Sequence, residues 1–89
     1  MKTLSTRIKP NSEWQTLEEL LNITFEADTT YSIQVRGANC LLALNTQEPE
    51  HPDYYIIYQN EKFEYIPDGT NKVWVKPDSK LDDVVIVVS

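Results

Sequence analysis

Apolar residues recur along the chain with two different periods, and the first of these is helical. Between residues 13 and 21 each lies three or four positions from another, at Trp14, Leu17, Leu20 and Leu21. Residues with this spacing share one side of an α-helix. The sequence therefore predicts a helix over 13–21, which is short enough to need support from the rest of the fold.

Beyond this helix the period falls to two, which is typical of β-strands. Between residues 30 and 36, Tyr31, Ile33 and Val35 alternate with polar residues, so we expect one face of this strand to be buried. Residues 40–44 form a continuous apolar run, which predicts a strand covered on both faces. The predicted strands are residues 22–27, 30–36, 40–44, 54–58, 63–66, 72–76 and 84–88.

Turn residues separate these strands. The Pro-Asp-Gly sequence at 67–69 is a strong turn signal, because proline presets φ and glycine accepts a positive φ. The short connection at 59–61 predicts that residues 54–58 and 63–66 form a hairpin, whereas 45–53 is a long loop. Short strands with turns roughly every 8 to 12 residues are typical of sandwiches and barrels. The predicted fold class is all-β: a small β-sandwich or jelly-roll-like barrel of about seven short strands with one short N-terminal helix.

The first twelve residues differ from the rest in composition. They are polar apart from the isolated Leu4 and Ile8, and Pro10 interrupts them. We therefore expect an N-terminal arm, residues 1–12, followed by a β-sandwich domain, residues 13–89. An arm of this composition is expected to become ordered on binding a partner and to be dispensable for folding.

The last predicted strand, residues 84–88, is the most hydrophobic stretch of the chain. Val84, Ile86 and Val88 share one face of it, and Val85 and Val87 share the other. A free edge strand of this kind would invite aggregation. Either the strand is central in its sheet, or a second subunit covers its outer face.

Aromatic residues are concentrated in the middle of the chain. Five of them fall within twelve positions, and a domain this small cannot bury both faces of so aromatic a hairpin. Some are therefore expected at the surface, either in a subunit contact or as a platform on which sugars stack. The candidate interface residues are Tyr54, Tyr55, Tyr58, Phe63 and Tyr65, together with Trp74, Val85 and Val87.

The charge balance excludes several classes of partner. Fourteen Asp and Glu residues stand against eight Lys and Arg residues, which gives a net charge of −6 and a pI of about 4.6. The phosphates of a nucleic acid would be repelled by such a surface, so we expect no nucleic-acid partner.

No apolar run approaches the ~20 residues of a membrane span, and residues 1–10 lack the apolar region of a signal peptide. No membrane association is expected.

The residue types used in catalysis are sparse. His51 is the only histidine and lies in one loop with Glu48, Glu50 and Asp53, whereas metal ligands usually come from several elements held in fixed geometry. Cys40, the only cysteine, begins an apolar strand, where a buried structural thiol is expected rather than a nucleophile. No Ser-His-Asp set and no glycine-rich phosphate loop can be assembled. We expect no enzymatic activity, no catalytic residues, no metal and no cofactor.

Four strand motifs follow one another from residue 28 onward. They are a "tYxIqxxG" strand, an apolar strand after its glycine, a "lWVk" strand and a final "VxVxe" strand. The pattern covers about two thirds of the chain and resembles small virion proteins encoded by tailed phages and prophages. The middle departs from it, being rich in tyrosine where the family often has glycine and alanine. The matching residues are Tyr31, Ile33, Gln34, Gly37, Val73, Trp74, Val75, Lys76, Val84, Ile86 and Val88.

The resemblance implies a non-enzymatic, all-β structural subunit of a phage particle, in a head fibre, capsid decoration or tail-associated role. It further implies a homo-oligomer, most often a homotrimer, that contacts other virion proteins. Such a protein would be assembled in the cytoplasm of the bacterial host and located in the virion. The alternative from the residues themselves is a small β-sandwich module that binds glycans or peptides through its tyrosine-rich hairpin.

Overall fold

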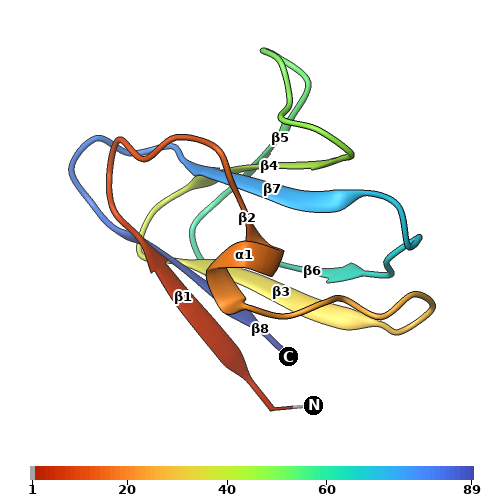
Figure 1. Ribbon diagram of the computed structural model, residues 1–89. Helices are drawn as coiled ribbons and strands as arrows, with labels where there is room; N and C mark the ends of the chain where they lie inside the picture. Colours follow the sequence, from red (N-terminus) through yellow and green to blue (C-terminus); the bar gives the residue numbers. More distant parts are fainter. Residues whose placement is uncertain (1) are drawn as a thin grey trace.

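The computed structural model describes residues 2–89 and is a sandwich of two antiparallel sheets (Figure 1). One sheet has the strand order β1-β8-β3-β6 and the other β2-β7-β4-β5. The prediction of a small all-β sandwich with a short helix near its N-terminus is confirmed. The elements are β1 Leu4–Ile8, β2 Gln15–Thr16, α1 Leu17–Leu21, β3 Tyr31–Arg36, β4 Cys40–Asn45, β5 Tyr55–Ile57, β6 Lys62–Tyr65, β7 Lys72–Pro77 and β8 Val84–Val88.

The first half of the chain pairs with the second half in reverse order. Strand β1 pairs with β8, β2 with β7, β3 with β6 and β4 with β5. Two further pairings, β3 with β8 and β4 with β7, join these ribbons into the two sheets. The described residues contain eight strands rather than the expected seven, because β1 and β2 were not predicted and residues 22–27 form no strand.

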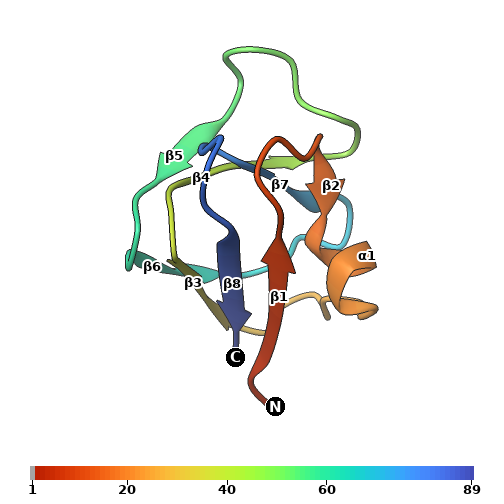
Figure 2. The same cartoon turned by 90° about the vertical axis from the view of Figure 1, so that its left-hand side faces the viewer.

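Strand β8 is central in its sheet, between β1 and β3 (Figure 2). Val84, Ile86 and Val88 are fully buried between the sheets, as the alternation predicted. Because β1 supplies one of the two neighbours of β8, residues 4–8 belong to the sandwich rather than to an arm outside it. Ile8 at the end of β1 is 2% exposed and is part of the core.

Helix α1 is shorter than the periodicity predicted. Thr16 caps it, because its hydroxyl accepts the N–H of Glu19 at 3.3 Å, and Gln15 and Thr16 themselves pair with β7. Asn22 ends the helix in the left-handed conformation, with φ of 53°. Pairing with β7 thus prevents the first half of the predicted helix from forming, and the chain leaves Asn22 as a loop rather than as the expected strand.

The predicted hairpin of residues 54–58 and 63–66 is wrong. Strand β5 pairs with β4 in one sheet, whereas β6 pairs with β3 in the other. The connection between them therefore crosses from sheet to sheet, and its backbone bonds to β3: Asn60 N–H donates to the carbonyl of Val35, and Val35 N–H donates to that of Glu61. Strands β5 and β6 each pair with a strand from the first half of the chain, so the turn at 59–61 does not form a hairpin.

The core lies between the two sheets and is formed mainly by the alternating residues that the sequence singled out. Tyr31, Ile33 and Val35 of β3 face Val73 and Val75 of β7 across this layer, and all five are buried. The expectation that β4 is covered on both faces holds only in part. Leu42 and Ala43 are buried, Leu41 is partly exposed and Leu44 is 42% exposed.

Candidate functional site

The exposed aromatic residues gather at strand β5. Tyr55 is 68% exposed, Ile56 46% and Tyr58 57%. Residues 55–57 form the edge strand of the second sheet, and Figure 2 shows β5 at the margin of the molecule. Ile56 was not singled out from the sequence, although it lies within the uncharged run of residues 54–60. The central four residues of this run, Tyr55, Ile56, Ile57 and Tyr58, are here called the β5 edge.

The β5 edge has no charged residue, unlike the two edge strands of the first sheet, β6 and β1. Strand β6, the edge of the first sheet on the same side, carries Lys62 and Glu64. Strand β1, the opposite edge, carries Arg7. Charged side chains are a common protection of sheet edges against pairing with another chain. Strand β5 lacks that protection.

Tyr54 is held at the start of this edge by other aromatic rings. Its ring centroid lies 5.8 Å from that of Trp14 and 5.6 Å from that of His51. Its hydroxyl is 2.8 Å from Nδ1 of His51, within hydrogen-bonding distance. Trp14, which the sequence assigned to the helix, thus supports the candidate site instead, and Tyr54 is only half-exposed.

A hollow at the start of the β5 edge adjoins a second hollow in the preceding loop. The first, of about 340 Å³, is lined by Ala43, Leu44, Asp53, Tyr54 and Tyr55. The second, of about 510 Å³, is lined by Asn45, Gln47, Glu48, Glu50 and Asp53. Asp53 belongs to both, so a surface with two tyrosines continues directly into one with three carboxylates.

Two hydrogen bonds hold the far end of the β5 edge. The N–H of Tyr58 donates to Oε1 of Glu61 at 2.8 Å, and the N–H of Gln59 donates to Oδ1 of Asn39 at 2.8 Å. Asn39 lies in the turn between β3 and β4, so the edge is fixed to the sandwich at this end. The exposed side chains of Tyr55, Ile56 and Tyr58 therefore stand on an anchored segment.

The other aromatic candidates are less accessible. Tyr65 is 6% exposed and belongs to the core, where its ring meets that of Phe25 edge-on at 5.6 Å. Burial, and then the charges of Glu18 and Asp68, raises the pKa of the Tyr65 hydroxyl. Phe63 is half-buried against the core.

Trp74 is also half-buried. Its indole Nε1 donates to the carbonyl of Asn45 at 3.1 Å, so its polar atom is already engaged within the domain. The structure therefore brings only Tyr54, Tyr55 and Tyr58 together at the surface among the predicted aromatic residues.

Val85 and Val87 lie on the outer face of the first sheet. Val85 is in register with Arg7 on one side and Arg36 on the other, and Val87 lies beside Gln34. Both valines are half-buried among these longer side chains. The two candidates thus form a small apolar strip on a face far from the β5 edge, on the other sheet.

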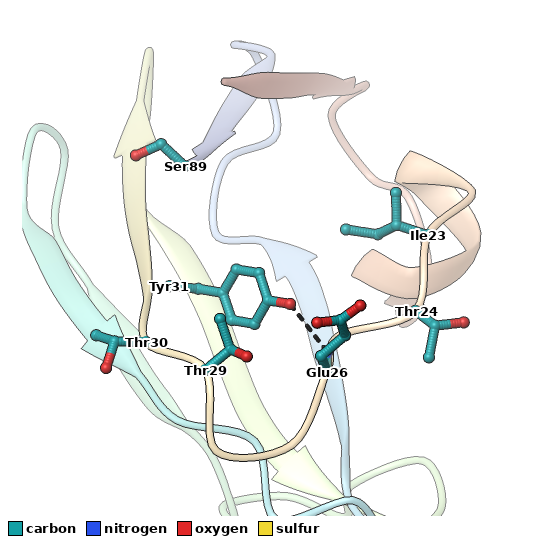
Figure 3. A pocket seen from close by; sticks show the side chains of 7 residues that line it. All are labelled: Ile23, Thr24, Glu26, Thr29, Thr30, Tyr31 and Ser89. Carbon is teal, nitrogen blue, oxygen red and sulfur yellow. Dashed lines mark hydrogen bonds between the residues drawn. The ribbon is translucent and has the colours of Figure 1, made fainter. Parts of the chain in front are cut away.

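A separate hollow of about 340 Å³ lies beside the loop of residues 23–30 (Figure 3). The ring of Tyr31 is buried at its base, and the Tyr31 hydroxyl accepts the N–H of Glu26 at 2.9 Å. The surrounding side chains include Thr24 and Thr29. None of the interface candidates predicted from the sequence lines it within residues 2–89.

Cys40 is fully buried, and burial raises its pKa from 9.0 to about 12. A thiol held protonated in this way is a poor nucleophile. In the part of the chain that the structure describes, no three His, Cys, Asp or Glu side chains are grouped as metal ligands. Among residues 2–89, no helix has the length and apolar character required to cross a membrane.

No protein-family model, curated protein or solved structure matches the chain.

Proposed function

We propose that the chain is a non-enzymatic structural subunit of a tailed-phage virion, as a head fibre, capsid decoration or tail-associated protein. The motifs that carry the resemblance lie in strands that form the core: β3, β7 and β8. Such a subunit acts through contacts with copies of itself and with other virion proteins. It is assembled in the bacterial cytoplasm and has no catalytic site.

The order of the strands supports this proposal. Pairing of β1 with β8, β2 with β7, β3 with β6 and β4 with β5 is the arrangement expected of a jelly roll. We infer that the sandwich is a small jelly roll, an architecture found in viral capsid proteins and in lectin domains. Because one fold can support many functions, the function has to be argued from the exposed residues.

The exposed β5 edge is the observation that carries the assembly role. Tyr55 and Tyr58 are more than half exposed, and Ile56 between them is 46% exposed. Tyrosine is enriched in protein interfaces, because it combines a large apolar area with a hydroxyl. Protein contact, rather than chemistry on a bound substrate, is what this surface supports.

For the contact between copies we propose the outer face of the first sheet. It presents Val85 between Arg7 and Arg36, and Val87 between Ser5 and Gln34. The homotrimer itself rests on the resemblance.

Sedimentation at micromolar concentration tests the oligomer, and antibody labelling of particles from a phage that encodes the chain tests the location. We expect a folded homotrimer and labelled particles. A folded monomer would overturn the homo-oligomer, and unlabelled particles would overturn the virion assignment.

A glycan-binding module is the second candidate function, and the Trp14–Tyr54 pair beside Asp53 favours it. Aromatic rings next to carboxylates and amides are suited to stacking against a sugar while bonding to its hydroxyls. A glycan array probed with the intact protein separates the two. Binding that is lost in Tyr54→Ala would replace the assembly role by a recognition role.

A further inference from the structure

We propose that the β5 edge binds an extended, basic segment of a partner protein by adding it as a further strand to the second sheet. This inference rests on the proposed assembly role, and it names the chemistry of the partner for one surface. The partner segment would alternate apolar residues with Lys or Arg.

Strand addition follows from the position and composition of β5. Within residues 2–89, only β4 pairs with β5, so one side of the backbone of Tyr55–Ile57 is open to another strand. The N–H groups at its two ends are already engaged, that of Tyr54 with the carbonyl of Pro52 and that of Tyr58 with Glu61, so the added pairing is confined to the strand itself. Tyr55 and Ile56 point to opposite faces, as neighbours in a strand do, and both are exposed. An added strand would therefore meet apolar side chains on both of its faces, which is how strand addition combines backbone bonds with side-chain selectivity.

The charge of the loop that leads into this edge selects a basic segment. Asp53 lines the same hollow as Tyr55, and Glu48 and Glu50 line the adjoining one. No Lys or Arg occurs between Arg36 and Lys62 in the sequence, so this part of the chain supplies no neutralising cation. A Lys or Arg that follows the paired residues of the partner would meet these carboxylates.

The same charges argue against a second copy of this chain as the occupant. Residues 37–61 contain four carboxylates and no Lys or Arg. Pairing β5 with β5 of another copy would bring two such segments together, whether the strands run parallel or antiparallel. Like charges at a contact are unfavourable, so a partner of opposite charge fits better.

The experiment selects short random peptides, displayed on a surface, against the intact protein. Peptides that are enriched are then synthesised and titrated against four variants. Ile56→Lys places a charge on the edge, and Ile66→Lys is its control, because Ile66 is 61% exposed but lies outside β5. A triple variant, Glu48→Gln with Glu50→Gln and Asp53→Asn, removes the acidic group, and Glu19→Gln with Glu26→Gln and Asp82→Asn removes three exposed carboxylates elsewhere.

We expect the enriched peptides to alternate apolar residues with Lys or Arg. Ile56→Lys should weaken their binding by about tenfold or more, as loss of a central contact does, while Ile66→Lys leaves it unchanged. The acidic triple variant should weaken binding and reduce its salt dependence, unlike the control triple variant. Methylation of alternate peptide amides, which removes backbone donors on one edge, should abolish binding.

The inference would be overturned by the absence of enriched peptides, by enriched peptides without basic residues, or by binding unaffected by Ile56→Lys and by amide methylation. Enrichment that requires the basic residues but survives amide methylation would also overturn it, since charge alone would then explain the binding. None of these results bears on the native mass or on particle labelling. The proposed function and this inference can therefore fail separately.

Discussion

The carboxylate of Glu18 accepts the backbone N–H of Val73, at 3.2 and 3.3 Å to its two oxygens. The bond joins helix α1 to strand β7 across 55 positions of sequence. A charged acceptor makes this a strong type of hydrogen bond, and it is partly shielded from water. It gives a very short helix a fixed place on the sandwich.

Glu18→Ala should lower the free energy of unfolding by about 1–2 kcal/mol, because a hydrogen bond to a charged group is lost. Glu19→Ala is the control, since Glu19 is exposed on the same helix, and it should change stability by less than about 0.5 kcal/mol. Urea denaturation of the two variants measures the difference. Equal stability would mean that Glu18 does not anchor the helix.

Gly37→Ala should destabilise the protein more than Gly69→Ala. Both glycines have a positive φ, 86° and 82°, and an alanine at either is strained. A Cβ at Gly37 would also lie 2.7 Å from the carbonyl oxygen of Asp83, whereas at Gly69 the nearest atom, Cβ of Ala27, is 3.8 Å away. We expect the extra loss at Gly37 to be about 1–3 kcal/mol, as for other overpacked sites, and thermal unfolding checks it.

Residues 4–8 should be needed for folding. Ile8→Ala removes a core side chain and should cost about 2–4 kcal/mol, whereas Ser5→Ala, on the exposed face of β1, should be nearly neutral. Deletion of residues 2–9 should unfold the domain, because β8 would lose one of its neighbours. A truncated chain that retains the thermal transition of the full chain would restore the idea of a dispensable arm.

Ile86→Asp should prevent folding, because it places an unpaired charge between the sheets, where Ile86 is fully buried. Lys80→Ala, in the exposed turn before β8, should cost less than about 0.5 kcal/mol. Circular dichroism of the two variants measures whether each of them folds. If Ile86→Asp folded normally, the central position of β8 would be incorrect.

Val85→Lys tests the proposed contact between copies. Val85 is half-buried on the outer face, so the lysine can extend into solvent and the protomer should still fold. Its charge, placed between Arg7 and Arg36, should dissociate the oligomer. Sedimentation and circular dichroism together decide: a variant of unchanged native mass would exclude this face as the contact.

The stability of the protein should fall at alkaline pH through Cys40. Its pKa is raised from 9.0 in the unfolded chain to about 12 in the fold, so the stabilising effect of the protonated thiol is complete below 9.0 and is lost progressively above it. Between about pH 8 and pH 10 the loss should be about 1.4 kcal/mol, in addition to that of other groups. Denaturation of the wild-type protein and of Cys40→Ala at both pH values checks this, and the variant should not show this part of the loss in unfolding free energy. An identical pH dependence in the two proteins would contradict the prediction.

Much of the core could be predicted from the sequence because side-chain direction in a strand depends on local alternation alone. Tyr31, Ile33 and Val35, and likewise Val84, Ile86 and Val88, are buried as their spacing indicated. The same spacing located β7 and β8 and identified the sandwich class. The sequence also predicts that some tyrosines in the middle of the chain are exposed, and Tyr55 and Tyr58 are.

Only the tertiary structure decided which strands are neighbours, because any extended segment offers the same backbone donors and acceptors to any other. The turn at 59–61 suggested a hairpin, yet β5 and β6 joined different sheets, and residues 4–8 became a strand once β8 was available to pair with them. Those pairings buried Tyr65 between the sheets and left Tyr55 at an open edge, although the two residues belong to one aromatic stretch. The sequence by itself determined which residues face inward along a strand, and the long-range backbone pairing determined where each strand, and with it the candidate site, lies.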